Sequence, residues 1–297
     1  MNSLAERIAA KSDAQAHPAI SEFAARLAEE AGALSVLFYG SNLRTGSLEG
    51  VLDYYVLLPG PQRERIWPRV SYREWSYDGH TLRAKIATMS LVQFAEAAAG
   101  NSRDTTIWAR FVQPSALVWF RDEQAKLKTL DALGQAAQTA ARLAVALGPE
   151  TGTADDFWRA LFQATYKAEF RVEKAGREDS ILAVNAEHFD GLLPLALSAQ
   201  NISYAEQGKQ ITPHLSNSDR RKTLAWWKRR RRLGKPLNIM RLLKASTTFD
   251  GAARYAAWKV ERHTGVPIEV TPWREKHPVL AAPAVLLKVW REQKKQR

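Results

Sequence analysis

The stretch from 36 to 58, VLFYGSNLRTGSLEGVLDYYVLL, constrains the fold of this chain more than any other. Two apolar runs, 36–39 and 51–58, flank a turn that begins at Gly40 and Ser41. Runs of β-branched and aromatic residues bounded by small residues predict two strands joined by a loop or a short helix. The second run carries one acid, Asp53, among apolar neighbours, and a buried carboxylate without a partner is costly. A metal ion or a cation beside Asp53 would remove that cost.

The same stretch predicts a site for a phosphate-bearing ligand. Gly40 lets the backbone approach a triphosphate closely. Backbone N–H groups and the Ser41 hydroxyl can hold phosphate oxygens, and Asp53 can hold a Mg²⁺ ion that bridges them. A strand, a Gly-Ser turn and a second strand with an acid resemble the core layout of a nucleotidyltransferase. The alternative is a plain strand–loop–strand unit with a capping serine.

Two further strands are expected at 71–77 and 81–89, joined by the hairpin signal Asp78-Gly79. They complete a small mixed sheet. Arg83 and Lys85 point the same way on the returning strand, because strand side chains alternate. We expect both to bind phosphate if that side faces the site. Otherwise they form one exposed face of an edge strand.

Helical periodicity dominates the rest of the chain. Ser3 can cap the first helix and Gly32 can end the second. The expected helical segments are 3–32, a helix capped by Ser90, 122–147, 154–176, 180–199 and 248–265, with an irregular polar segment at 200–219. The sequence therefore predicts an α+β protein with a nucleotidyltransferase-type mixed sheet and flanking helices, followed by a mainly helical second domain.

The loop at 148–153, Gly-Pro-Glu-Thr-Gly-Thr, is the expected domain boundary. We expect a nucleotidyltransferase-like domain at 1–148, a helical domain with a basic cluster at 149–270, and an amphipathic basic C-terminal segment at 271–297.

The net charge of +12 favours anionic partners: nucleic acid, acidic lipid or phosphorylated substrates. The chain has no cysteine, which excludes disulfides and thiolate metal sites and fits a reducing compartment. It shows no signal-peptide core and no apolar run of the roughly 18 residues that a membrane span needs. We therefore expect a cytoplasmic protein, peripheral on the inner membrane surface.

Nine basic residues between 220 and 235 surround two adjacent tryptophans. We expect Trp226, Trp227, Arg229 and Arg230 to contact a membrane surface, because tryptophan prefers the interface and basic residues bind anionic lipid. A nucleic-acid patch and a solvated basic loop are the alternatives. The segment 278–297 joins apolar residues to a basic end, which is typical of an interfacial helix or of a last helix docked on the core.

Other chemistries lack support. The six histidines show no HxxxH or HxH spacing. No GxSxG, Walker A or GxGxxG pattern is present.

Several short segments resemble the mitochondrial-type phosphatidate cytidylyltransferases, which are peripheral CDP-diacylglycerol synthases of the nucleotidyltransferase superfamily. The segments are Tyr39-Gly40-Ser41, Leu52-Asp53-Tyr54-Tyr55-Val56, 84–90 (AKIATMS), 107–114 (IWARFVQP) and, more faintly, Ile202-Ser203-Tyr204. The resemblance implies a Mg²⁺-dependent domain, a helical second domain and a C-terminal segment that touches the membrane. It implies that CTP and phosphatidate give CDP-diacylglycerol and pyrophosphate, a step of phospholipid biosynthesis in lipid metabolism.

Under this resemblance Asp53 and Lys85 are the catalytic residues, with Asp53 also holding the metal ion. Gly40, Ser41 and Arg83 then bind the nucleotide. Tyr55 stands where the superfamily usually has a second acid, so another ligand must come from elsewhere, with Glu49 and Asp78 as candidates. Two alternatives remain open: a nucleotidyltransferase with a tRNA, small-molecule or protein acceptor, and an inactive nucleotidyltransferase fold acting as a membrane or RNA adaptor.

Overall fold

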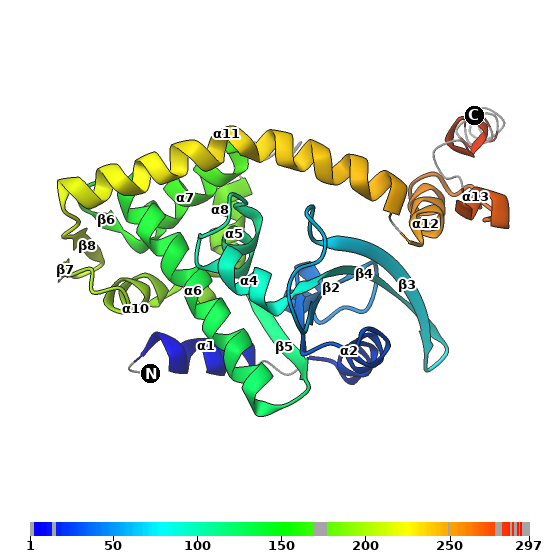
Figure 1. Ribbon diagram of the computed structural model, residues 1–297, viewed down its shortest axis with the longest axis horizontal. Coiled ribbons are helices and arrows are strands. Elements are labelled where there is room, and N and C mark those ends of the chain that lie inside the picture. The colour runs from blue at the N-terminus through cyan, green and yellow to red at the C-terminus, as the bar shows by residue number, and fades with distance from the viewer. Residues whose placement is uncertain are drawn as a thin grey trace.

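The computed structural model describes residues 3–13, 16–168, 177–248, 250–276, 281–285, 287, 290 and 292. Its fold is α+β, with one mixed sheet and a larger helical region (Figure 1). The predicted fold class is confirmed at that level. Within the described residues, no helix combines the length and the apolar character that crossing a bilayer requires.

The five-stranded sheet has the order β3-β4-β2-β1-β5. Its strands are β1 (Ser35–Tyr39), β2 (Leu52–Leu58), β3 (Arg69–Tyr77), β4 (His80–Ser90) and β5 (Ser115–Phe120). Strands β2 and β4 run parallel, and every other neighbouring pair is antiparallel. The four strands expected from the sequence are therefore present, with β5 added at the edge beside β1.

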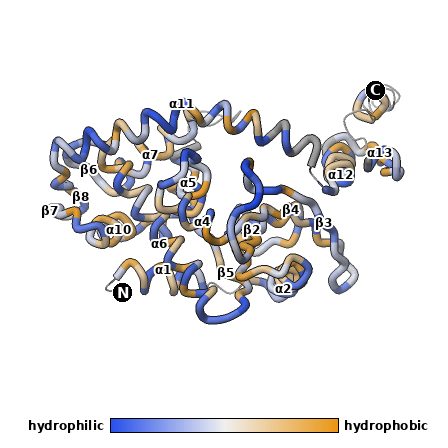
Figure 2. The backbone as a smooth tube through the Cα atoms, in the orientation of Figure 1, coloured by the Kyte–Doolittle hydropathy of each residue, from blue (hydrophilic) through white to orange (hydrophobic). Residues whose placement is uncertain are grey.

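Strand alternation divides the sheet residues between two hydrophobic layers. Phe38, Tyr54 and Val56 face α2 (Pro18–Ala31). Leu37 and Tyr55 face the opposite layer, which contains α4 (Leu91–Ala98), α5 (Thr106–Phe111) and α6 (Glu123–Leu147). Figure 2 shows hydrophobic stretches of the backbone trace in the region of the central strands. Both faces are covered, which explains why β1 and β2 read as continuous apolar runs.

The second hydrophobic layer continues into the helical region without a break. Its buried residues include Leu57 from the sheet, Ala140 from α6, and Phe157, Trp158 and Leu193 from beyond the loop at 148–153. The expected boundary at residue 148 thus separates elements in sequence but does not separate two cores. The remaining elements of this region are α1 (Leu4–Ser12), α7 (Ala154–Ala168), α8 (Arg177–Val184), α9 (Ala186–Phe189), α10 (Leu192–Ser198), β6 (Gly152–Thr153), β7 (Tyr204–Gln207) and β8 (Gln210–Pro213).

A long helix, α11 (Asn217–Thr248), crosses the whole molecule along the top of Figure 1. Its first half packs on α6 and α7, and its second half reaches β3. After α11, Asp250 forms a β-bridge with Ser71 at the sheet edge. The helices α12 (Ala252–Thr264) and α13 (Pro272–Lys276) follow. Gly251 permits this return, because a Cβ atom there would lie 2.6 Å from the Tyr72 carbonyl oxygen. The chain thus comes back from the helical region to the sheet.

Several expected local features are confirmed. The Ser3 hydroxyl accepts from the Glu6 backbone N–H, Ser90 caps α4, and Gly32 ends α2 in the left-handed conformation.

Two other expectations need correction, and a third is covered only in part by the described residues. The single helix expected at 180–199 is divided into α8, α9 and α10, with Gly191 in the left-handed conformation at the start of α10. The segment 200–219, expected to be irregular, contains the β7–β8 hairpin and begins α11. The helix expected at 154–176 is described only to Ala168, since 169–176 lie outside the described residues.

Candidate functional site

The turn after β1 brings Gly40 against Asp53. Gly40 begins α3 (Ser41–Thr45) with φ 92°. A Cβ atom at this position would lie 3.1 Å from Oδ2 of Asp53, which is tighter than ordinary van der Waals contact. The glycine therefore provides both the left-handed backbone and the space beside the carboxylate. Ser41 is exposed next to it, and Asn42 holds the following loop through the carbonyl oxygens of Ser47 and Glu49, both at 2.8 Å.

Asp53 occupies the middle of a row across three strands. It is paired with Tyr39 on β1 and with Lys85 on β4, so the three side chains share one face. The Asp53 carboxylate is partly buried and accepts no hydrogen bond from the residues that the structure describes. Burial raises its pKa, while the charges of Lys85 and Arg110 act in the opposite direction. The site thus keeps a carboxylate in a poorly solvated place beside two cations.

A cavity of about 160 Å³ opens on this face. Four cations line it: Lys85, Arg110, Arg241 and Lys244. Lys85 has no acid within ion-pair distance among the described residues, so its ammonium can serve a ligand. This concentration of positive charge next to one carboxylate suits a polyphosphate, alone or with a metal ion.

Two of these cations come from α11 and also tie that helix to the sheet region. Arg241 forms a two-pronged ion pair with the buried Asp104, with both N–O distances at 2.9 Å. Its Nε donates to the Trp67 carbonyl oxygen at 2.9 Å. Lys244 pairs with Glu64 and donates to the Ile66 carbonyl oxygen. These contacts fix the segment before β3 as one wall of the cavity.

Arg110 is the fourth cation of the cavity and comes from α5. Its guanidinium donates to the Tyr39 hydroxyl at 3.0 Å and lies 5.2 Å from the centre of that ring. Tyr39 belongs to the strand that leads into the Gly40 turn, so Arg110 is held close to the same turn. An arginine in this place can contact phosphate oxygens with two N–H groups at once.

The donor set fits a Mg²⁺ ion that is held largely by its substrate. Among the described residues no group of three or more His, Asp and Glu side chains converges. Tyr55, in the position of the usual second acid, is buried against Phe111 at 5.1 Å between ring centres. Mg²⁺ needs only one or two carboxylates when phosphates and water supply the other ligands. Asp53 and the space left by Gly40 meet that requirement.

The structure does not bring the two candidate second ligands together with Asp53. Asp78 lies in the β3–β4 turn, beyond the Tyr77–His80 pair. This pair is five residues along β4 from Lys85, or roughly 16 Å at 3.3 Å per residue. Glu49 is exposed and lines a separate cavity together with Arg83, Trp258 and Arg262.

Arg83 and Lys85 share a face of β4, as expected, but they line different cavities. Arg83 pairs with Glu74 at 3.5 Å, donates to the Thr81 carbonyl oxygen, and lies 5.6 Å from the centre of the Trp258 ring. A role in phosphate binding at the Asp53 cavity is therefore less direct for Arg83 than for Lys85.

The basic cluster at 220–235 lies on α11, and its residues fall into a packed group and an exposed group. Trp227 is buried and packs on Trp108, with 6.1 Å between ring centres. Trp226 is half-buried, and its indole N–H donates to the Gly100 carbonyl oxygen at 3.1 Å. Arg230 donates to Ser102 and to Gly100. These three residues hold α11 on α5 and the loop before it, so Trp227 cannot insert into a membrane in this structure.

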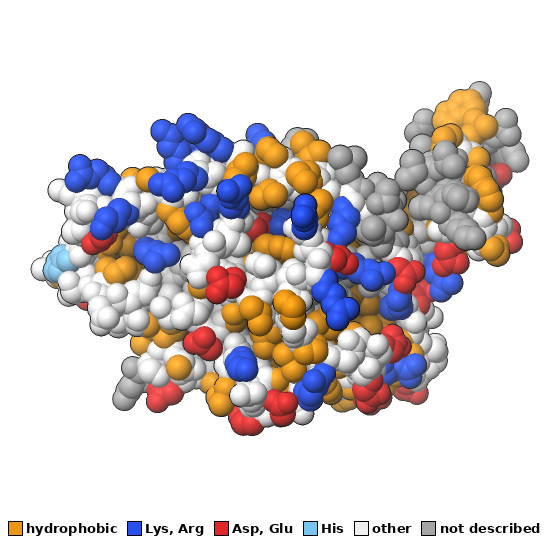
Figure 3. Space-filling model, viewed as in Figure 1, with side chains coloured by type: hydrophobic (Ala, Val, Ile, Leu, Met, Phe, Trp, Pro, Cys, Tyr) orange, Lys and Arg blue, Asp and Glu red, His pale blue; other side chains and the backbone are white. Residues whose placement is uncertain are grey.

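The other basic residues of the cluster are directed outward. The exposed members are Arg221, Lys222, Lys228, Arg229, Arg231, Arg232 and Lys235. Figure 3 shows basic side chains gathered along the edge of the molecule where the first half of α11 runs. Of the predicted membrane contacts in this cluster, Arg229 is the one that remains exposed.

The C-terminal segment 278–297 lies mostly outside the described residues. Within the described part, Leu287 and Trp290 are exposed and Ala281 is buried. Trp273, on α13, is exposed as well. An apolar surface is therefore present near this end of the chain.

Sequence reasoning missed Arg241, Lys244 and Thr106 as residues of the cavity. Thr106 hydrogen-bonds Asp104 at 2.5 Å and lines the cavity. No local pattern marks these positions, since they reach the cavity only through the crossing of α11 and the position of α5. Arg110 was noted only as part of a resembling segment.

Comparison with protein-family models and with curated protein sequences finds no match to this chain.

Proposed function

We propose that this protein is a Mg²⁺-dependent nucleotidyltransferase that transfers the cytidylyl group of CTP to phosphatidate. The observation that carries the proposal is the Asp53–Lys85 pair beside the Gly40 turn, at a cavity lined by four cations. A triphosphate needs several cations and, for its metal ion, at least one carboxylate. Both are present on one face of the sheet.

Each residue of the site has a role that follows from its position. Gly40 gives the backbone room beside Asp53, and the Ser41 hydroxyl is exposed at the start of α3. Lys85 and Arg110 stabilise the charge that develops on the leaving pyrophosphate. Asp53 would hold the Mg²⁺ ion, which when bound supplies charge neutralisation of the triphosphate.

The reaction balances without a covalent enzyme intermediate. An oxygen of the phosphatidate phosphate forms a bond with the α-phosphorus of CTP. The bond from that phosphorus to the bridging oxygen breaks, and pyrophosphate leaves with the electron pair. The attacking phosphate is already an anion, so no side chain has to remove a proton. Lys85, Arg110 and Asp53 need only hold the reactants in line.

The choice of acceptor is supported by the resemblance of the 39–41 and 52–56 segments and by the surface. An exposed basic row on α11 and exposed apolar residues near the C-terminal end suit an anionic lipid surface. Ile239 and Met240 are exposed apolar residues that follow the basic residues along α11. A protein that docks in this way would act as a peripheral membrane enzyme.

The test is incubation with radiolabelled CTP, Mg²⁺ and vesicles that contain phosphatidate, followed by extraction of the lipid. We expect a labelled CDP-lipid and release of pyrophosphate. ATP, GTP and UTP in place of CTP give the nucleotide preference, and vesicles without phosphatidate test the acceptor. Nucleotide binding and pyrophosphate release without a labelled lipid would point to another acceptor.

A second candidate is a nucleotide-binding adaptor that performs no transfer. The observation that favours it is the single carboxylate: Tyr55 is buried, and Asp78 lies far along the hairpin. Under this alternative CTP and Mg²⁺ bind without any pyrophosphate release, whichever acceptor is offered. Calorimetric binding and a pyrophosphate assay on the same sample separate the two candidates.

A further inference from the structure

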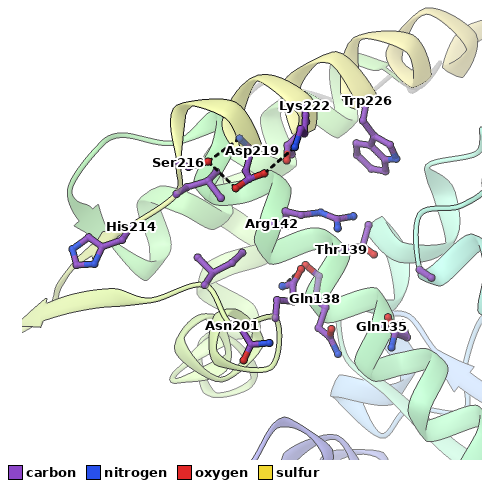
Figure 4. Close-up of a pocket in the computed structure, with 15 residues that line it drawn as sticks. Gln135, Gln138, Thr139, Arg142, Asn201, His214, Ser216, Asp219, Lys222 and Trp226 are labelled. Carbon is purple, nitrogen blue, oxygen red and sulfur yellow. Dashed lines mark hydrogen bonds and ion pairs between the residues drawn. The ribbon is translucent and has the colours of Figure 1, made fainter.

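A second and larger cavity lies in the helical region, away from the Asp53 face (Figure 4). Its volume is about 720 Å³, within the range of pockets that hold metabolites. It is formed by α6, the connection from α10 to β7 and the beginning of α11. None of its lining residues belongs to the cavity beside Asp53.

Arg142 is the main charged group of this second cavity. Its side chain extends from α6 toward Trp226 across the open space, and its guanidinium carbon lies 6.0 Å from the centre of the indole ring (Figure 4). Among the described residues it has no acid within ion-pair distance and no hydrogen-bond acceptor. Burial lowers its pKa. A partly buried guanidinium without an anion is unfavourable, so an anionic ligand here would be stabilised.

A second guanidinium increases this positive field. Arg230 lies 4.2 Å from the centre of the same indole ring and donates to the carbonyl oxygens of Gly100 and Ser102. Burial lowers its pKa to about 10, with a further contribution from repulsion by Arg229 and Arg142. Carbonyl oxygens solvate Arg230 but do not neutralise it.

The acid in the cavity wall does not balance these charges. Asp219 accepts a hydrogen bond from the Ser216 hydroxyl at 2.7 Å and lies 3.6 Å from Lys222 (Figure 4). Its carboxylate is thus already engaged at the start of α11. The charged groups of the wall, Arg142, Lys222 and Asp219, sum to one positive charge.

Neutral hydrogen-bonding groups surround the rest of the space. The side chains of Gln135, Gln138 and Thr139 come from the same helix as Arg142, and Asn201 faces them from the loop before β7 (Figure 4). Amides and hydroxyls at such positions orient a polar ligand by donating and accepting hydrogen bonds.

We propose that this cavity binds a small polar metabolite through an anionic oxygen group, phosphate or carboxylate, that pairs with Arg142. The neutral amides bind the rest of the molecule, and the Trp226 ring packs beside the guanidinium. The site is distinct from the one that carries the proposed transfer, and it does not depend on that function.

Fluorine NMR of protein labelled with 5-fluorotryptophan tests this proposal at residue level. Trp226 reports on the second cavity, and Trp67 reports on the first, because the Arg241 guanidinium lies 5.3 Å from its ring. Trp226→Phe and Trp67→Phe assign the two resonances. The probes are sodium phosphate and sodium malonate, titrated separately at constant ionic strength.

We expect the Trp226 resonance to shift with at least one of the two anions. Phosphate alone indicates a phosphorylated ligand, malonate alone a carboxylate ligand, and both indicate a general anion site. In Arg142→Gln the midpoint should move to about tenfold higher concentration or more, since a charge-assisted hydrogen bond is lost. Arg142→Lys keeps the charge and should retain part of the affinity.

Arg229→Gln is the matched control, because it removes an exposed arginine from α11, the helix that carries Trp226. It should leave the midpoint of the Trp226 shift unchanged. A Trp226 resonance that neither anion moves overturns the proposal. Equal midpoints in Arg142→Gln and the unmodified protein also overturn it, as does an equal loss in Arg142→Gln and Arg229→Gln.

Discussion

The cavity on the sheet face and the cavity between α6 and α11 differ in how charge is arranged around them. The cavity on the sheet face is lined by four cations, and one carboxylate, Asp53, lies beside it as the strand partner of Lys85. In the cavity between α6 and α11, Arg142 has no acid within ion-pair distance in the part of the chain that the structure describes, and the acid of the wall, Asp219, is engaged by Ser216 and Lys222. Burial disfavours the charged form in both cases, raising the pKa of Asp53 and lowering that of Arg142.

This difference indicates what each cavity can bind. A carboxylate among cations can accept a divalent metal ion together with an anionic ligand, so the first cavity suits a metal-bound triphosphate. A guanidinium among amides lacks a metal ligand and suits an organic anion. The overall charge of +12 does not distinguish these cases; the local placement of single acids does.

The largest effect is expected from Asp53→Asn on transfer activity. The substitution keeps the shape of the side chain but removes the charge that would hold Mg²⁺. We expect the turnover of CTP in a pyrophosphate-release assay to fall by roughly 10²- to 10³-fold, the size of a lost electrostatic contact in a transition state. Asp78→Asn, on the exposed hairpin turn, should keep full turnover. Undiminished activity in Asp53→Asn would remove the basis of the proposed function.

The next effect concerns His188 on α9, where the helical region contacts Val112, the residue that follows α5. Its Nε2 lies 2.9 Å from the Val112 carbonyl oxygen, so the neutral ring donates there. Burial lowers its pKa from 6.5 to about 4, helped by the charges of Arg7 and Lys11. The neutral ring therefore stabilises the fold above pH 6.5, and this contribution is lost as the pH falls toward 4.

Denaturant unfolding of the unmodified protein should show a loss of up to about 3 kcal/mol across this pH range. In His188→Gln the pH dependence should be much weaker, because glutamine does not titrate. His80→Gln changes an exposed histidine of the hairpin and serves as the control. If His188→Gln and the unmodified protein lose the same stability, other groups cause the acid sensitivity.

The sheet and its glycine turn could be predicted from sequence because their signals are local. Alternating and continuous apolar runs, Asp78-Gly79 and Gly40 lie within a few residues of the structures that they specify. The cavity wall could not be predicted in the same way. Arg241 and Lys244 meet Asp104 and Glu64 across more than 130 residues of chain, through a helix whose path has no local marker.

The two tryptophans illustrate why the surface was harder to predict than the core. Adjacent basic residues made Trp226 and Trp227 look like interfacial side chains. In the helix they lie on the side that packs against Trp108, while basic residues such as Arg221, Lys228 and Arg232 lie on the outer side. Packed and exposed positions alternate here with the period of a helix. The density of basic residues on both sides of the two tryptophans makes this period hard to recognise in the sequence.

A smaller effect is expected from Asp53→Asn on stability. Since the pKa of Asp53 in the fold lies above the ordinary value of 3.8, the ionised carboxylate destabilises the native state at neutral pH. Removing it should raise the Tm at pH 7 by roughly 2 °C, the gain for about 1 kcal/mol in a chain of this size. Below pH 3.8 the carboxylate is protonated in both states, and the gain should disappear. A lower Tm at pH 7 would show that the charge is well solvated or paired.

The smallest effect is expected at Arg142, where added phosphate should reverse the order of the Tm values of the variant and the unmodified protein. Arg142→Met keeps the length of the side chain and removes an unpaired cation, so the Tm in buffer free of multivalent anions should rise by about 1 °C. Adding phosphate should stabilise only the unmodified protein, because a ligand that binds the native state raises its stability. The order of the two Tm values should then invert.

Arg229→Met removes an exposed arginine from α11 and should change the Tm little in either buffer. An equal response of Arg142→Met and Arg229→Met to phosphate would mean that the ion acts on the surface charge as a whole. An inversion confined to Arg142→Met would instead locate the anion in the cavity between α6 and α11. An anion bound beside the desolvated base Arg142 would then agree with the proposed difference in ligand between the two cavities, in which the desolvated acid Asp53 takes the metal ion of the proposed transfer.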